Sequence, residues 1–112
     1  MRWILRSKIH NATLTEANPA YIGSITIDHE LMERAGMRAG EKVLVLSNER
    51  GERLETYVIA GESGSGAIAM NGTALCMKSG EQVIIMDFEL ADSTLAAAIV
   101  LVDETNRYVR IL

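Results

Sequence analysis

Short apolar segments recur along the whole chain and are separated by polar turns. Runs of this length that are rich in β-branched and aliphatic residues are typical of β-strands. Two polar stretches, Asn48–Glu52 and Glu104–Asn106, indicate turns between strands. The expected strands are Arg2–Arg6, Tyr21–Ile27, Lys42–Ser47, Arg53–Ala60, Ala67–Met70, Gln82–Leu90, Ile99–Asp103 and Tyr108–Ile111. So many short strands predict a mainly β domain that closes into a small barrel.

Helical signals are few and short. Asp28 can cap a helix over Glu30–Ala35, and Gly36 follows at the position where glycine commonly ends a helix. The other helical candidates are a single turn over Thr73–Met77 and a helix through Leu95–Ala97 that Ser93 would cap. The pattern therefore predicts two or three short helices beside the strands.

One internal repeat stands out. Residues Met37–Leu46 resemble Met77–Met86: each copy has a methionine, a base, a small residue, Gly-Glu and an apolar run. Two copies are fewer than a solenoid needs to bury its faces. The repeat instead predicts a barrel with internal pseudo-two-fold symmetry. Gene duplication and convergence on a turn-plus-strand pattern both explain it.

Composition limits the class of protein. The chain has 112 residues, the length of one domain, and 48% apolar residues are enough for a core. Aromatic residues make up only 4%, so the core must rest on aliphatic side chains and methionine. A net charge of −4 without a basic cluster argues against nucleic acid or an anionic membrane as partner.

The sequence also indicates a cytoplasmic protein without a metal. No apolar run reaches the roughly 20 residues of a membrane span, and the first residues are too soon charged for a secretory signal. The single cysteine, Cys76, has no partner for an internal disulfide, which fits a reducing compartment. With His10 and His29 as the only histidines, no metal-ligand spacing is present.

The pair Gly23-Ser24 is the strongest candidate for chemistry. It directly precedes the strand-type residues Ile25–Ile27, whereas Gly64-Ser65 lies in a stretch typical of a flexible loop. A glycine allows backbone conformations that other residues avoid, so the serine hydroxyl can approach the preceding carbonyl carbon. An N→O acyl shift requires that approach. Ser24 is thus either a nucleophile that cuts its own backbone or an ordinary serine at a strand edge.

Several other polar residues share strand faces. Lys8 and His10 alternate and so lie on one face, as do Arg53 and Tyr57 in the strand expected there. The pair Asn71-Gly72 is typical of a turn. Each feature alone also fits an ordinary solvated surface.

Order and spacing, taken together, carry a family resemblance from Leu5 to about Phe88. The matching segments are Lys8–His10, Thr15–Asn18, Tyr21–Asp28, Glu55–Ile59, Gly64–Gly66 and Asn71–Ala74. In these segments the chain resembles the pyruvoyl-dependent L-aspartate 1-decarboxylases of bacterial pantothenate synthesis. The resemblance implies one domain over residues 1–112, folded as a small double-psi β-barrel with pseudo-two-fold symmetry.

The resemblance also implies self-processing. Ser24 would attack the Gly23 carbonyl, and the chain would separate into residues 1–23 and 24–112. Residue 24 would become a pyruvoyl group, a covalent cofactor that the protein makes itself, with no metal and no pyridoxal phosphate. Thr56 stands where the family has the threonine that steers cleavage. Cleavage by the chain alone and cleavage assisted by a maturation factor both stay open.

The implied reaction turns L-aspartate into β-alanine and carbon dioxide through an imine with the pyruvoyl group. Arg53 and Lys8 would hold the substrate carboxylate with His10 close by, and Tyr57 would donate the proton. The residues implied to line the pocket are Asn71, Gly72, Thr73 and Ala74. The resemblance further implies a homotetramer whose sites lie between subunits.

Two departures from the family pattern accompany these expectations. The segment after Asn71-Gly72 is about one residue shorter than usual and lacks a run of alanines, and Ser63 stands where a base is common. Alternative functions are decarboxylation of a related acid such as glutamate, since one methylene changes binding by only about 1–3 kcal/mol, or an unprocessed barrel that acts as a binding module.

Overall fold

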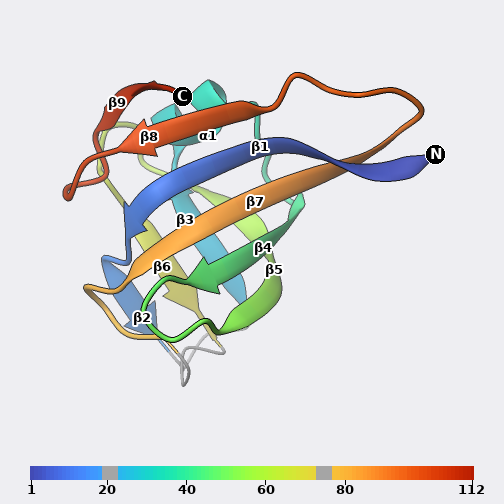
Figure 1. Ribbon diagram of the computed structural model, residues 1–112. Coiled ribbons are helices and arrows are strands. Elements are labelled where there is room, and N and C mark those ends of the chain that lie inside the picture. The colour runs from blue at the N-terminus through green and yellow to red at the C-terminus, as the bar shows by residue number, and fades with distance from the viewer. Residues whose placement is uncertain (19–22, 73–76) are drawn as a thin grey trace.

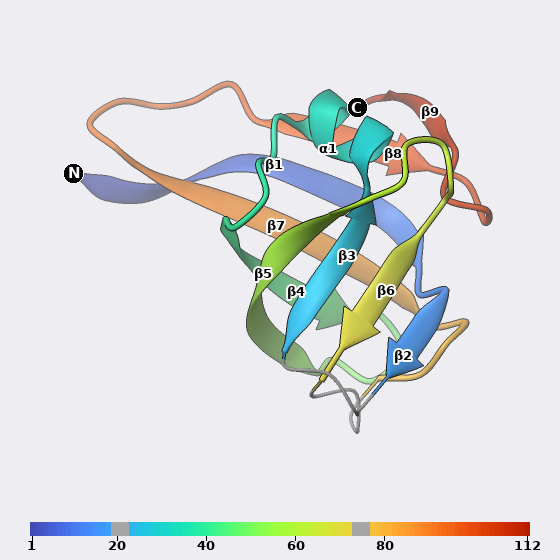
Figure 2. The ribbon, with the colours of Figure 1, turned by 180° about the vertical axis from the view of Figure 1, so that it is seen from behind.

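The computed structural model describes residues 1–18, 23–72 and 77–112. These residues form a strongly curled nine-stranded sheet with the order β2-β6-β3-β5-β4-β7-β1-β8-β9 (Figures 1 and 2). The elements are β1 (Arg2–Thr13), β2 (Glu16–Asn18), β3 (Ser24–Asp28), α1 (His29–Ala35), β4 (Lys42–Ser47), β5 (Arg53–Gly61), β6 (Ile68–Asn71), β7 (Gln82–Ala91), β8 (Ala98–Val102) and β9 (Tyr108–Ile111). The predicted mainly β class is confirmed.

Local sequence signals located several elements closely. Strands β4 and β9 have the predicted bounds. Helix α1 begins one residue earlier than expected, with the Asp28 carboxylate accepting a hydrogen bond from the Glu30 amide at 2.9 Å. Gly36 ends it in the left-handed conformation at φ 73°. Both caps are the residues that the sequence predicted. Each one satisfies backbone groups that the end of the helix leaves unpaired.

Other predictions were wrong. The helix through Leu95–Ala97 does not form, because residues 92–97 make the connection from β7 to β8. Helix α1 is the only helix in the described part of the chain, and the turn over Thr73–Met77 lies outside it except for its last residue. Strand β1 extends to Thr13 because it pairs with β7 on one edge and with β8 on the other. A bulge with Asn11 at φ 64° accommodates its polar middle.

The expected closure of the barrel is also incomplete. The hydrogen-bonded order of the described strands ends at β2 and β9, so the ladder does not run round without a break. Strand β2 nevertheless follows β1 after only Leu14 and Thr15, whose amides each donate a 2.9 Å hydrogen bond, to the carbonyls of Glu81 and Ile68 respectively. The chain itself therefore links β2, at one end of the strand order, to β1 near the other end.

The register agrees with the predicted internal symmetry. Strands β4 and β7, which belong to the two copies of the repeat, pair antiparallel with Val45 opposite Ile85. These two residues are equivalent positions of the repeat, so a local two-fold axis passes between them. The turns before the two strands match as well, because Gly40 and Gly80 have φ values of 89° and 92°.

Aliphatic side chains fill the interior of the curled sheet, as the composition predicted. Ile25 and Ile27 of β3 and Val45 of β4 are fully buried. Leu31 and Met32 of α1 pack against the same core. Figures 1 and 2 show β1 and β7 on one side of this core and β3 and β6 on the other. No helix in the described ranges is long and apolar enough to cross a membrane.

Asp87 on β7 is a buried carboxylate with 2% of its surface exposed. The Arg6 guanidinium donates hydrogen bonds to both Asp87 and Glu41, and Glu89 lies 3.8 Å away from it. Burial first, and then the hydrogen bond and charge of Glu41, raise the pKa of Asp87 to about 6, although Arg6 opposes this. Because this pKa exceeds the ordinary value of 3.8, the favourable contribution of Asp87 to stability is complete below about pH 4 and lost as pH rises through about 6.

Asp87→Asn is therefore expected to raise the free energy of unfolding by about 1–2 kcal/mol at about pH 8. Asparagine stays neutral, so the gain should shrink to near zero below about pH 4. Urea denaturation over this pH range measures the difference. Asp103→Asn is the matched control, and its change in the free energy of unfolding is expected to have the opposite sign. The reason is that hydrogen bonds from Arg107 and Thr105 lower the pKa of Asp103. A difference for Asp87→Asn that is the same at every pH would contradict this reasoning.

Candidate active site

Ser24 is the first residue of β3 and is only 2% exposed. Successive side chains of a strand point to opposite faces. Because Ile25 and Ile27 point into the core, Ser24 and Thr26 share the opposite face of the sheet. The strand therefore holds the candidate nucleophile at its start, within a hydrogen-bonded ladder.

Asn71 holds the Ser24 hydroxyl from the neighbouring strand. It is the last residue of β6 and lies directly opposite Ser24 in the antiparallel pair. Its side-chain amide nitrogen, Nδ2, donates hydrogen bonds to Ser24 Oγ at 2.9 Å and to Thr26 Oγ1 at 3.1 Å. The serine oxygen accepts here, so its own proton is available for transfer to a base. The structure thus brings together two residues that the family resemblance had placed at one site.

Strand β5 supplies the next two residues of the site. It pairs parallel with β3, with Ile25 opposite Val58. Continuing this register by two positions places Tyr57 beside Ser24 and Thr56 beside Gly23. Tyr57 is 43% exposed, whereas Thr56 is half-buried on the same face of the strand as Val58. The continued register therefore puts the threonine expected to steer cleavage beside the residue after which cleavage is expected.

Gly23 does not have the backbone conformation, one that other residues avoid, that the sequence suggested for it. Its φ is outside the left-handed region, and a Cβ added to it would meet no atom within 4 Å. The backbone at this position thus does not require glycine, because its φ is one that other residues adopt and a Cβ has room. The comparison pair Gly64-Ser65 does lie in a turn, with Gly64 at φ 80°.

Lys8 and His10 lie on a different wall of the sheet. Both are half-buried on β1 and share its outward face, since Ser7 and Ile9 are buried. Strands β7, β4 and β5 separate β1 from β3, and the core lies between the two walls (Figures 1 and 2). The fold therefore does not bring Lys8 or His10 to the Ser24 of the same chain.

Arg53 and Tyr57 share the exposed face of β5, as predicted. Arg53 is the first residue of the strand and pairs with Leu46 of β4. Tyr57 pairs with Lys42 of the same neighbouring strand, so both side chains lie beside β4.

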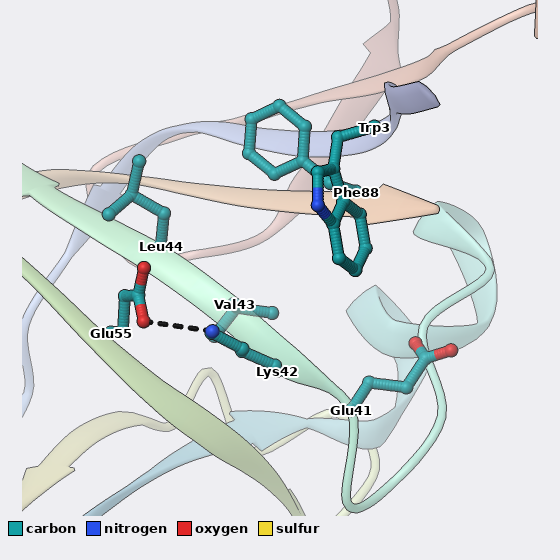
Figure 3. Close-up of a pocket in the computed structure, with 7 residues that line it drawn as sticks. All are labelled: Trp3, Glu41, Lys42, Val43, Leu44, Glu55 and Phe88. Carbon is teal, nitrogen blue, oxygen red and sulfur yellow. Dashed lines mark ion pairs between the residues drawn. The ribbon is translucent and has the colours of Figure 1, made fainter. Parts of the chain in front are cut away.

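A pocket of about 520 Å³ lies on the outer face of β1, β4, β5 and β7 (Figure 3). The Lys42 ammonium and the Glu55 carboxylate form a 2.9 Å ion pair in it. Its lining residues are Trp3, Glu41, Lys42, Val43, Leu44, Glu55 and Phe88. None of the expected site residues lines this pocket, so it is not the site that contains Ser24.

The rest of the expected pocket wall is described only at its beginning. Gly72 has φ 91°, which favours glycine, and its amide donates a 2.7 Å hydrogen bond to the Asn18 carbonyl. Thr73 and Ala74 lie outside the described residues, as does Cys76. Within the described ranges, no group of three or more His, Cys, Asp or Glu side chains could hold a metal ion.

Thr26 is a site residue that sequence reasoning missed. It contacts Asn71 through its hydroxyl and is half-buried on the same strand as Ser24. The signal that could have found it is the spacing of two, which puts residues 24 and 26 on one face of a strand.

Comparison with known proteins places the chain among the decarboxylases. Residues 1–109 match the family described as aspartate decarboxylase, and the chain belongs to that family. It is 51% identical to the aspartate 1-decarboxylase of Caldicellulosiruptor saccharolyticus over 96% of this chain and 88% of that protein. The enzyme of the same name from Neisseria meningitidis is 45% identical over 95% of this chain and 87% of its own length.

Proposed function

We propose that the protein decarboxylates L-aspartate to β-alanine and carbon dioxide with a pyruvoyl group made from its own Ser24, in the cytoplasm, for pantothenate synthesis. The observation that carries this proposal is the Ser24 hydroxyl held by Asn71 at the start of β3. Membership of the aspartate decarboxylase family supports the reaction, and relatives named aspartate 1-decarboxylase support the substrate. A single cysteine supports the reducing compartment.

Cleavage begins when Ser24 Oγ attacks the Gly23 carbonyl carbon and gives its proton to a base. The C–N bond then breaks, which leaves an ester and a free amine on residue 24. Loss of the Cα proton breaks the Cβ–Oγ bond, and Gly23 leaves as a carboxylate. Water hydrolyses the resulting dehydroalanine to a ketone and releases ammonia. The register of β3 and β5, continued by two positions, supports Thr56 as the residue that orients the carbonyl that is attacked.

The described residues fit a pyruvoyl group at position 24. The Asn71 amide that donates to Ser24 Oγ can donate equally to a carbonyl oxygen in that place. A pyruvoyl group supplies a ketone that takes up the substrate amine and accepts the electron pair left by the departing carboxylate. The same register, continued by one position, supports Tyr57 as the residue that returns a proton to the carbon that lost the carboxylate.

Recognition of the substrate falls to the basic residues. A guanidinium can bind both oxygens of a carboxylate, so Arg53 suits the side-chain carboxylate of aspartate. Lys8 and His10 add positive charge and hydrogen-bond donors. Holding the side-chain carboxylate leaves the α-carboxylate free to depart.

The site requires two copies of the chain. Strand β1, which carries Lys8, and strand β3, which begins with Ser24, lie on opposite walls of one sheet with the core between them. A substrate held at residue 24 therefore meets the Lys8 and His10 of a neighbouring subunit. The exposed Trp3, at 67%, and Phe88 provide apolar surface for such contacts. We propose a homotetramer with sites between subunits, which light scattering of the purified protein tests directly.

Intact-mass measurement of the purified protein tests the cofactor. We expect two fragments, residues 1–23 and 24–112, and a larger fragment that reacts with hydroxylamine through its ketone. A single uncleaved mass after long incubation at raised temperature would contradict cleavage by the chain alone. If cleavage then occurs only after addition of a cell extract, a maturation factor is required. An assay with L-glutamate in place of L-aspartate measures the selectivity for chain length.

Arg53→Ala is expected to leave cleavage intact and to lower kcat/KM for aspartate by about 100-fold, mainly through KM. The magnitude follows from the loss of a charged, bidentate contact of about 1.5–3 kcal/mol. Steady-state kinetics of the cleaved protein measure it. Arg110→Ala, which removes an exposed arginine from β9, is the matched control. Failure of Arg53→Ala to cleave would overturn this division of roles.

A further inference from the structure

The Asn71 side chain spans two hydroxyl groups on one face of β3. Its amide nitrogen donates to Ser24 Oγ at 2.9 Å and to Thr26 Oγ1 at 3.1 Å. An amide nitrogen has two hydrogens, so these two bonds use both of them. The direction of the hydrogen that reaches Ser24 is therefore fixed by the bond to Thr26.

Thr26 is held in place independently of Asn71. Its methyl carbon lies against Gly61 of β5, where a Cβ added to the glycine would be only 3.0 Å away. Threonine is branched at Cβ, so a methyl group fixed by packing also fixes the direction of the hydroxyl. The packing of β3 against β5 thus sets the position of Thr26 Oγ1, and this oxygen orients the Asn71 amide.

We propose that Thr26 is a positioning residue for self-cleavage, which holds the Asn71 amide on Ser24 Oγ. The inference rests on the proposed cleavage after Gly23 and deepens it. During elimination the Cβ–Oγ bond of residue 24 breaks, and Oγ leaves as part of the Gly23 carboxylate. Negative charge develops on this oxygen, and a donor already directed at it stabilises the charge without reorganisation.

Two substitutions separate the hydroxyl of Thr26 from its packing. Thr26→Val keeps the methyl contact with Gly61 and removes the hydroxyl, and we expect cleavage about tenfold slower. Thr26→Ser keeps the hydroxyl, and we expect cleavage within about threefold of the unmodified chain. Thr105→Val removes an exposed hydroxyl that donates to Asp103 and not to the site, and serves as control. Freshly made precursor is incubated at raised temperature, and the cleaved fraction is followed by intact mass.

Urea denaturation of the same precursors shows whether a slower rate merely follows lower stability. Thr26→Val that cleaves as fast as the unmodified chain would overturn the inference. Thr26→Ser that is as slow as Thr26→Val would also overturn it, because a hydroxyl at residue 26 would then not be enough to hold the Asn71 amide on Ser24. An unmodified chain that never cleaves would instead overturn the proposed self-cleavage itself, and the two failures are thus distinct.

Discussion

Ser24→Ala is expected to abolish both cleavage after Gly23 and decarboxylation. Alanine has no oxygen to attack the Gly23 carbonyl, so no ester forms and no ketone is generated at residue 24. Without the ketone the electron pair of the departing carboxylate has no acceptor. We expect activity to fall by at least about 1000-fold, which corresponds to about 4 kcal/mol of lost transition-state stabilisation. Intact mass and an assay of β-alanine formation measure the two losses.

The chain contains a matched control for this substitution. Ser65→Ala alters the second Gly-Ser pair, which lies in the turn between β5 and β6. We expect this variant to cleave and to react normally. Circular dichroism of Ser24→Ala checks that the buried substitution leaves the sheet folded. A Ser24→Ala chain that still separates at residue 23, or still forms β-alanine, would refute the assigned role.

The parts of the fold that local sequence predicted are those that local interactions determine. The caps of α1 depend on Asp28 and Gly36 and on backbone groups within a few residues of them. Strand β4 could be bounded because its apolar run ends in a turn around Gly51, where φ is 68°. In both cases the contacts that set the bounds of the element join residues that are close together in the sequence.

The wrong predictions of secondary structure lie in segments whose structure depends on pairing with strands that are distant in the sequence. Strand β2, Glu16–Asn18, has no β-branched residue, and its extended form depends on parallel pairing with β6. The alanines before Ala98 have high helix propensity, but β8 pairs with β1 from that residue onward. Tertiary pairing overrides propensity in both segments.

The candidate site likewise has features that the sequence predicts and features that depend on distant strand pairing. The position of Ser24 directly before the strand-type residues Ile25–Ile27 is visible in the sequence, and the family resemblance supplied Asn71. The hydrogen bond between them crosses 47 residues and depends on the register of β3 and β6, which no local pattern encodes. The role proposed for Lys8 is beside the Ser24 of a second subunit, because three strands of the sheet order separate β1 from β3 within one chain.

Mixing two inactive variants tests this arrangement of the site. Ser24→Ala subunits supply Lys8 and His10 but no ketone, and subunits with Lys8→Ala and His10→Ala supply the ketone only. Each alone should have no more than about 1% of normal activity, because the first lacks the ketone and the second lacks two charged contacts of about 1.5–3 kcal/mol each. When both are produced together in equal amounts, about one site in four combines the intact residues of both chains. We therefore expect about a quarter of normal activity.

Two controls make the result decisive. Ser24→Ala mixed equally with the unmodified chain should give about half of normal activity, because only the subunit that carries the ketone is limiting. This control also shows that mixed assemblies form. If the two inactive variants stay inactive while this control behaves as expected, Lys8 acts on the Ser24 of its own chain, and the proposed site between subunits is wrong. Restored activity has no other source, because no single chain in the mixture carries Ser24, Lys8 and His10 together.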